Sequence, residues 1–301
     1  MDLNNVFSQV LILFFIMLVG YFSRKRNIIE KSINKGLIEL ILNITLPFMI
    51  LSSFNYEFSK EMLINAFRLY TISLVLYLTL VVLSKYLFKK YPYNERSVMR
   101  FVTIFSNCGF MGYPVVESVY GKIGIFYTAI FNINFNILIW TVGVMLFNNK
   151  EKQNVKKVFL NPGLVSVILG FILFIFSIKL PYPIQRTLEL IGSTTTPLSM
   201  IIVGSMLADI NINEFFKDYK IYYISLLRLI IIPLVTLTIL KFFNFSGMLL
   251  GIPVLIMAMP AAANTALFAE KFDADVSLAS KCVFFTTVLS VVTIPLIIML
   301  L

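Results

Sequence analysis

The sequence predicts an all-α polytopic membrane protein with ten transmembrane helices. Three observations support this: 59% of the 301 residues are hydrophobic, only 13% are charged, and long apolar stretches recur along the whole chain. A helix needs about twenty apolar residues to cross the hydrocarbon core of a bilayer. The net charge of +10 does not indicate nucleic-acid binding, because no polar stretch is long enough to form a soluble basic domain.

The predicted spans follow one another at short intervals. The first has no basic segment before it and is followed by Arg24, Lys25 and Arg26, so we interpret it as a retained span and not as a signal peptide. The fourth, seventh and ninth spans are interrupted by Gly, Pro, Asn or Thr. The ten spans are residues 6–23, 36–54, 62–84, 98–118, 124–147, 161–178, 187–207, 220–240, 249–269 and 277–299.

The basic residues of the loops predict the orientation. Short loops rich in Lys and Arg stay in the cytoplasm. Eighteen Lys and Arg residues belong to one side, against five on the other. The sequence therefore predicts a multi-pass plasma-membrane protein with both termini outside. The five residues of the outer side are Lys60, Lys122, Lys179, Arg186 and Lys241.

Two ten-residue segments indicate a duplication. Residues 38–47, IELILNITLP, and residues 188–197, LELIGSTTTP, carry the same residue at five positions, including a glutamate and a proline. Composition alone would give shared leucines, but seldom a coincident glutamate and proline.

A duplicated unit of five spans has a topological consequence. Because five is odd, the second copy enters the membrane from the opposite side, which makes a 5+5 inverted repeat. We assign residues 1–150 to the first five-helix repeat and residues 151–301 to the second. Two such halves can exchange inward-facing and outward-facing poses, which is the basis of alternating access.

The fourth and ninth spans carry helix-breaking residues at corresponding places. Irregular backbone at membrane depth is tolerated where it lines a cavity or is buried in protein, and freed N–H groups at helix starts attract anions. Small residues would let the two segments approach closely. A simpler alternative is that Pro and Gly only kink packing helices. The candidate substrate-binding residues are Asn107, Gly109, Gly112, Tyr113, Pro114, Met259, Pro260 and Asn264.

Two arginines lie inside the third and eighth spans. Arg68 and Arg228 are each roughly 9 to 12 Å from the side on which their span begins. Either they extend to the membrane surface and anchor their helices, or they offset the charge of a substrate carboxylate.

Polar residues surround the two repeated prolines. Their hydroxyl and amide oxygens, with carbonyls freed by the prolines, could bind a coupling ion such as sodium, or they could only cap and hydrogen-bond their own helices. Glu39 and Glu189 are predicted near helix entries, and proton coupling also stays open. The residues in question are Asn43, Thr45, Pro47, Ser193, Thr195 and Pro197.

Several chemistries lack their residues. The chain has no histidine, and both cysteines, Cys108 and Cys282, lie in apolar stretches, so we expect no metal site, no cofactor and no enzymatic activity. A membrane receptor that binds a small ligand in the same cavity without translocating it is the alternative to a transporter.

Two segments resemble a known family. Residues 106–146, beginning SNCGFMGYP, and residues 259–300, beginning MPAAANTALF, resemble the auxin efflux carrier family. The resemblance implies ten spans with crossing fourth and ninth helices over an anion site. It also implies transport of a small organic anion, such as malonate or malate in bacteria. Only residues 148–160 join the halves, which favours a bacterial inner-membrane member; a homodimer stays open.

Overall fold

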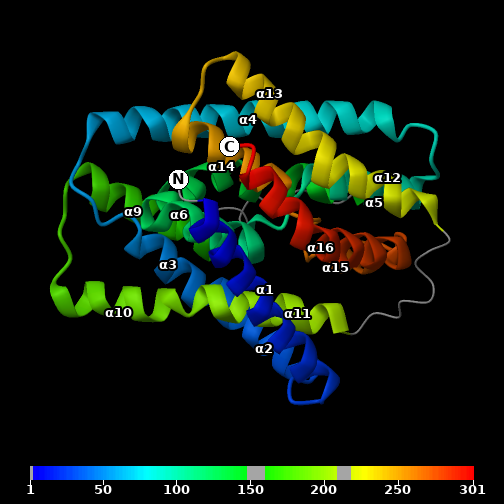
Figure 1. The fold of residues 1–301 in the computed structure, drawn as a ribbon, viewed down its shortest axis with the longest axis horizontal. Helices are drawn as coiled ribbons and strands as arrows, with labels where there is room; N and C mark the ends of the chain where they lie inside the picture. The colour runs from blue at the N-terminus through cyan, green and yellow to red at the C-terminus, as the bar shows by residue number, and fades with distance from the viewer. Residues whose placement is uncertain (1–2, 148–159, 209–217) are drawn as a thin grey trace. The chain divides into compact units, whose positions relative to one another are not determined.

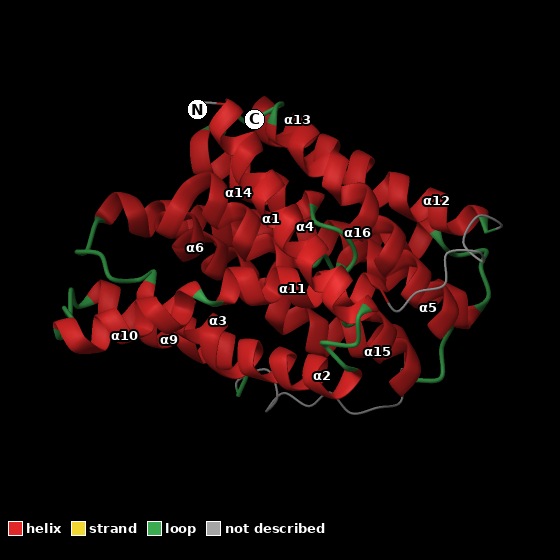
Figure 2. Ribbon diagram, turned by 60° about the horizontal axis from the view of Figure 1, so that its bottom comes forward, coloured by secondary structure: helices red, strands yellow, loops and turns green. Residues whose placement is uncertain are grey.

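The computed structural model describes residues 3–147, 160–208 and 218–301. Across these ranges the regular elements are all helices, joined by loops (Figure 2), with one isolated antiparallel bridge between Ser106 and Ala261. Seven helices are long and apolar enough to cross a membrane, and two shorter apolar helices accompany them. The predicted all-α membrane protein is therefore confirmed. The ten-span inverted repeat stays a prediction.

The helices are coloured along the chain in Figure 1. In order they are α1 (Leu3–Lys25), α2 (Lys31–Leu40), η1 (Ile41–Thr45), α3 (Leu46–Ser52), α4 (Lys60–Leu87), α5 (Tyr93–Ile104), η2 (Cys108–Gly112), α6 (Tyr113–Leu138), η3 (Ile139–Gly143), α7 (Val144–Phe147), α9 (Pro162–Ile175), α10 (Tyr182–Ser193), α11 (Thr195–Ala208), α12 (Tyr219–Leu226), η5 (Leu227–Ile231), α13 (Ile232–Phe242), α14 (Gly247–Ala258), α15 (Thr265–Lys271) and α16 (Val276–Ile298).

The chain folds as two compact units, and each unit draws on both predicted halves. The boundary predicted at residues 150 and 151 lies outside the described residues, so the two repeats remain a prediction. Unit 1 comprises Met1–Tyr70, Tyr113–Ile133 and Lys156–Asp209, and unit 2 comprises Thr71–Gly112, Asn134–Val155 and Ile210–Leu301.

Unit 1 is held together by close helix packing. Helix α1 packs along α11, and a side chain at Gly20 or Gly204 would collide with the backbone carbonyl of Ile201 or Met17 respectively. Small residues at such contacts let two membrane helices approach to backbone distance. Helix α3 packs against α9 and α10 in the same unit.

Unit 2 is built around buried aromatic side chains. The ring of Phe101 on α5 lies 4.8 Å from that of Phe105 and 5.0 Å from that of Phe268 on α15, measured between centroids. Phe147 on α7 lies 5.3 Å from Phe101. This packing fixes the end of α5 and the start of α15, which flank the candidate site described below.

Three π-helices end two residues before a proline. Helices η1, η2 and η5 lead into α3, α6 and α13, each of which has a proline in its first two positions: Pro47, Pro114 and Pro233. A proline has no N–H and its ring collides with the carbonyl four residues earlier, so the turn before it widens. Around Pro47 the chain therefore stays helical. Before Pro197, α10 ends at Ser193 and α11 begins at Thr195.

Candidate functional site

Unit 2 contains two interrupted helices that pair through extended backbone. Helix α5 ends at Ile104, and Phe105 is extended; α14 ends at Ala258, and Met259 is extended. The N–H of Asn107 donates to the carbonyl of Pro260 at 2.8 Å, and the N–H of Ala262 donates to the carbonyl of Phe105 at 3.1 Å. The interruptions predicted in spans four and nine are thus present, and each satisfies backbone groups of the other.

Asn107 caps the helix that follows the interruption. Its side-chain oxygen accepts the N–H of Phe110 at 3.2 Å, and the residue is 4% exposed. Within the described part of the chain its side-chain nitrogen donates to no protein acceptor. The capping bond therefore fixes the amide oxygen and leaves the NH₂ group as a donor.

Asn264 stands at the equivalent point of the second interruption. It is half-buried, precedes α15 directly and makes no side-chain capping bond. Met259 and Pro260 are buried. These residues belong to, or directly follow, the extended segment that pairs with the segment containing Asn107; their role in binding a substrate stays a prediction.

The two glycines of the first interruption differ in their surroundings. A Cβ at Gly109 would meet no atom within 4 Å, whereas a Cβ at Gly112 would lie 2.9 Å from Cδ1 of Ile256. Gly109 therefore borders open space two residues after Asn107, and Gly112 packs against α14. Tyr113 and Pro114 are buried at the start of α6, in the part of that helix assigned to unit 1.

Arg228 lies in unit 2 and makes contacts that the sequence did not predict. It is 0% exposed, and its guanidinium donates to the carbonyls of Met259 (3.0 Å), Thr103 (3.0 Å) and Ile256 (3.4 Å). Arg68, in unit 1, is exposed. The two arginines therefore have different environments, and Arg228 does not extend to the surface.

The residues predicted around the repeated prolines lie in unit 1. Thr45 and Thr195 are buried, and their hydroxyls have no hydrogen-bond partner among the described residues. Asn43 and Ser193 are exposed and donate to their own helices, at the carbonyls of Glu39 and Leu190. Pro47 is buried and Pro197 is exposed.

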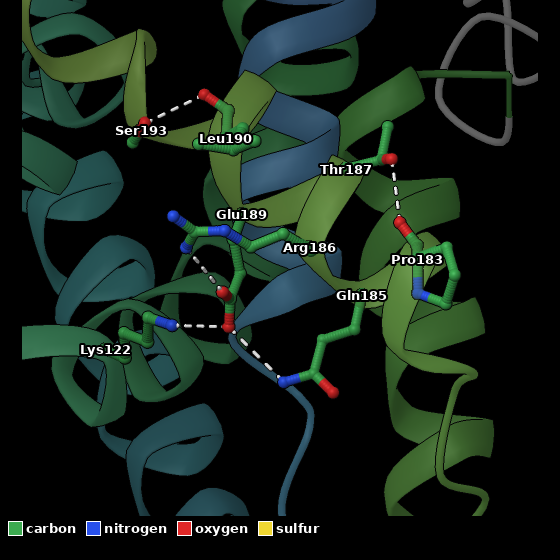
Figure 3. Close-up of polar contacts among 8 residues, drawn as sticks. All are labelled: Lys122, Pro183, Gln185, Arg186, Thr187, Glu189, Leu190 and Ser193. Carbon is green, nitrogen blue, oxygen red and sulfur yellow. Dashed lines mark hydrogen bonds and ion pairs between the residues drawn. The ribbon is translucent and has the colours of Figure 1, made fainter.

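Glu189, predicted near a helix entry, is the centre of an ion-pair network in unit 1 (Figure 3). Lys122 donates to its Oε1 at 2.7 Å and Gln185 to the same oxygen at 3.3 Å, while Arg186 approaches Oε2 at 3.3 Å. Lys122 follows Gly121, whose φ of 63° kinks α6. The network thus ties α10 to α6 beside this kink.

The long apolar helices are those of a multi-pass membrane protein, and two of its helices are interrupted and pair through their backbone. A model of the Membrane transport protein family matches residues 5–298, and the chain belongs to this family, the auxin efflux carrier family whose motifs it resembles.

Relatives in archaea and bacteria match nearly the whole chain. An uncharacterized transporter of Methanocaldococcus jannaschii is 27% identical over 299 residues, 95% of this chain and 96% of the relative. The uncharacterized transporter YfdV of Escherichia coli is 26% identical over 296 residues, 93% of each chain.

Proposed function

We propose that this protein is a secondary transporter that moves a small organic anion, a carboxylate, across the plasma membrane by efflux or exchange. The observation that carries the proposal is the pair of helix interruptions in unit 2, joined at Asn107 and Pro260. Broken helices at corresponding positions of two related halves mark the binding sites of secondary transporters. Membership of a membrane transport family supports the same conclusion.

The chemistry of the interruption suits a carboxylate. The free NH₂ group of Asn107 and the side chain of Asn264 offer hydrogen-bond donors in a largely buried setting, where such bonds to a charged oxygen are strong. The start of the long helix that η2 and α6 form adds a favourable dipole. Arg228 donates to the carbonyls of Thr103 on α5 and Ile256 on α14, so these carbonyls are partly neutralised and repel an anion less.

The proposal includes the architecture that alternating access requires. Ten spans form a 5+5 inverted repeat with crossing fourth and ninth helices, both termini lie outside, and the membrane is the inner membrane of a bacterium. A sodium or proton gradient is the candidate driving force, with Thr45 and Thr195 as candidate ion ligands. A homodimer is compatible with this scheme.

Counterflow in proteoliposomes tests the function. Vesicles loaded with an unlabelled carboxylate should accumulate the labelled compound transiently, and a panel of mono- and dicarboxylates, with and without sodium or pH gradients, identifies cargo and coupling. Saturable binding without counterflow for every compound would support the receptor alternative instead. If Asn107→Ala and Asn264→Ala transported at wild-type rates, the site assignment would be wrong.

A further inference from the structure

We propose that Arg228 is a positioning residue, which joins the ends of α5 and α14 and thereby holds the paired interruption in shape. The inference deepens the proposed function, because this interruption is where we place the substrate. Its geometric part, however, can be tested without any transport measurement.

The contacts place Arg228 at both helix ends at once. Thr103 is the next-to-last residue of α5, Ile256 lies in the last turn of α14, and Met259 directly follows that helix. The last carbonyls of a helix lack partners within the helix. The guanidinium of Arg228 donates to the carbonyls of Thr103 (3.0 Å) and Ile256 (3.4 Å) in these last turns, and to the carbonyl of Met259 (3.0 Å) just after α14.

The electrostatics match this arrangement. Each helix C-terminus carries about half a negative elementary charge, so two termini together balance about one positive charge. Arg228 is fully buried, and among the described residues no Asp or Glu forms an ion pair with it. A buried charge is costly unless it is compensated. We infer that the two helix ends are the counter-charge of Arg228.

The same bonds connect Arg228 to the candidate site. Met259 adjoins Pro260, whose carbonyl accepts the N–H of Asn107, and Thr103 stands four residues before Asn107. Without the guanidinium, both segments lose this attachment at residues that precede the pairing residues in the chain. Because its nitrogens are already directed at carbonyls, Arg228 acts through Asn107 and not as a direct ligand of the substrate.

Alkylation of Cys108 tests the geometric part. The chain has two cysteines, so Cys282→Ala leaves Cys108, which adjoins Asn107 and is 1% exposed. In this background, Arg228→Gln should raise the rate of alkylation by N-ethylmaleimide at least about tenfold, because the pairing opens more often. Arg228→Lys keeps the positive charge but lacks the planar guanidinium with its several N–H donors, so it should give an intermediate alkylation rate.

The matched controls are Arg68→Gln and Arg68→Lys at the exposed arginine of α4, which should change the rate by less than about twofold. An unchanged rate in Arg228→Gln would overturn the proposal. If that variant does not accumulate in the membrane, the alkylation rate of Cys108 is measured in Arg228→Lys alone. An unchanged rate in that variant would then overturn the proposal.

Transport by the same variants completes the test. Arg228→Lys should lower the counterflow rate while Cys108 becomes more reactive. Loss of transport with unchanged Cys108 reactivity would make Arg228 a direct substrate ligand and contradict the inference. If the protein with Arg228 intact moves none of the carboxylates but the alkylation result holds, the positioning role stands and the proposed function fails.

Discussion

Asn107 combines two roles in one side chain. Its oxygen caps the helix that begins at η2, and its nitrogen is the donor that we propose for the substrate. Aspartate has nearly the same shape and is an equally good cap, but it has no donor and carries a negative charge.

Asn107→Asp should therefore keep the folding of the protein and lose its transport. We expect the thermal midpoint to stay near that of the wild type and the counterflow of a carboxylate to fall at least about tenfold, since the binding donor is replaced by a repelling charge. Asn107→Ala is the control, and it should also lose about 1 kcal/mol of stability with the cap. Wild-type counterflow in Asn107→Asp would remove Asn107 from the site.

Gly109 and Gly112 offer a second comparison at this scale. An added methyl group at Gly109 enters open space, whereas at Gly112 it lies 2.9 Å from Cδ1 of Ile256. We expect Gly109→Ala to fold normally and to raise KM, and Gly112→Ala to cost about 1 to 3 kcal/mol through overpacking. Thermal unfolding and concentration-dependent counterflow measure both effects. A larger loss of stability in Gly109→Ala than in Gly112→Ala would contradict the assignment of open space.

The exposed pair of Glu57 and Lys179 gives a prediction for pH. A hydrogen bond from Lys179, and its charge, hold the pKa of Glu57 below its usual range. A lowered pKa contributes stability to the folded state at pH values above the unfolded-state pKa. This contribution is lost as the pH falls through the lower, folded-state pKa. Both side chains are 76% exposed, so water screens the pair. Lys179→Gln should therefore leave the thermal midpoint unchanged at pH 7 and pH 4; a clear loss at pH 7 alone would show that the pair matters.

A proline follows the π-helical turn that carries Arg228. The π-helix η5 contains Arg228 and leads into α13, which has Pro233 in its second position. Without the proline the turn can return to α-helical geometry, which rotates the residues before it.

We expect Pro233→Ala to raise the alkylation rate of Cys108 in the Cys282→Ala background, because Arg228 moves away from the helix ends. Pro47→Ala removes the equivalent proline after η1 in unit 1 and serves as control, with an unchanged rate. Equal rates in the two variants would show that the π-turn does not position Arg228.

The sequence predicted those elements whose signals are local. Asn107 and Pro260 mark the two interruptions because asparagine and proline act on the backbone beside them. The bond from Arg228 to Thr103 joins residues 125 positions apart, and no local pattern reports such a contact. Similarly, Gly121 shows a positive φ inside α6, where the sequence predicted only a loop between two spans.

The candidate site draws on both predicted halves of the chain. Phe105 and Asn107 come from the first, and Pro260 and Ala262, which pair with them, come from the second. The duplication stays a prediction that rests on matched segments of sequence. The division of the chain into two compact units, each with segments of both predicted halves, could not be predicted, because it depends on packing between helices distant in the chain.

Two loops of unit 1 give a test of topology. Lys179 pairs with Glu57 at 2.8 Å, and the N–H of Phe58 donates to the hydroxyl of Ser177 at 3.0 Å. Both loops must therefore lie on one face of the membrane, which is the outer face in the predicted orientation. Glu57→Cys and Lys179→Cys should react with a membrane-impermeant maleimide in whole cells, and Asn27→Cys should not. Reversed labelling would place the termini inside.

We propose that the substrate binds at the paired interruption. An experimental density map of the protein in lipid nanodiscs, with the carboxylate that gives the strongest counterflow, tests this most directly. We predict density for the anion within hydrogen-bond distance of the side-chain nitrogen of Asn107 and beside Asn264, with the backbone pairing of Asn107 and Pro260 retained. An anion bound elsewhere, or continuous helices through residues 105–107 and 259–264, would contradict the account.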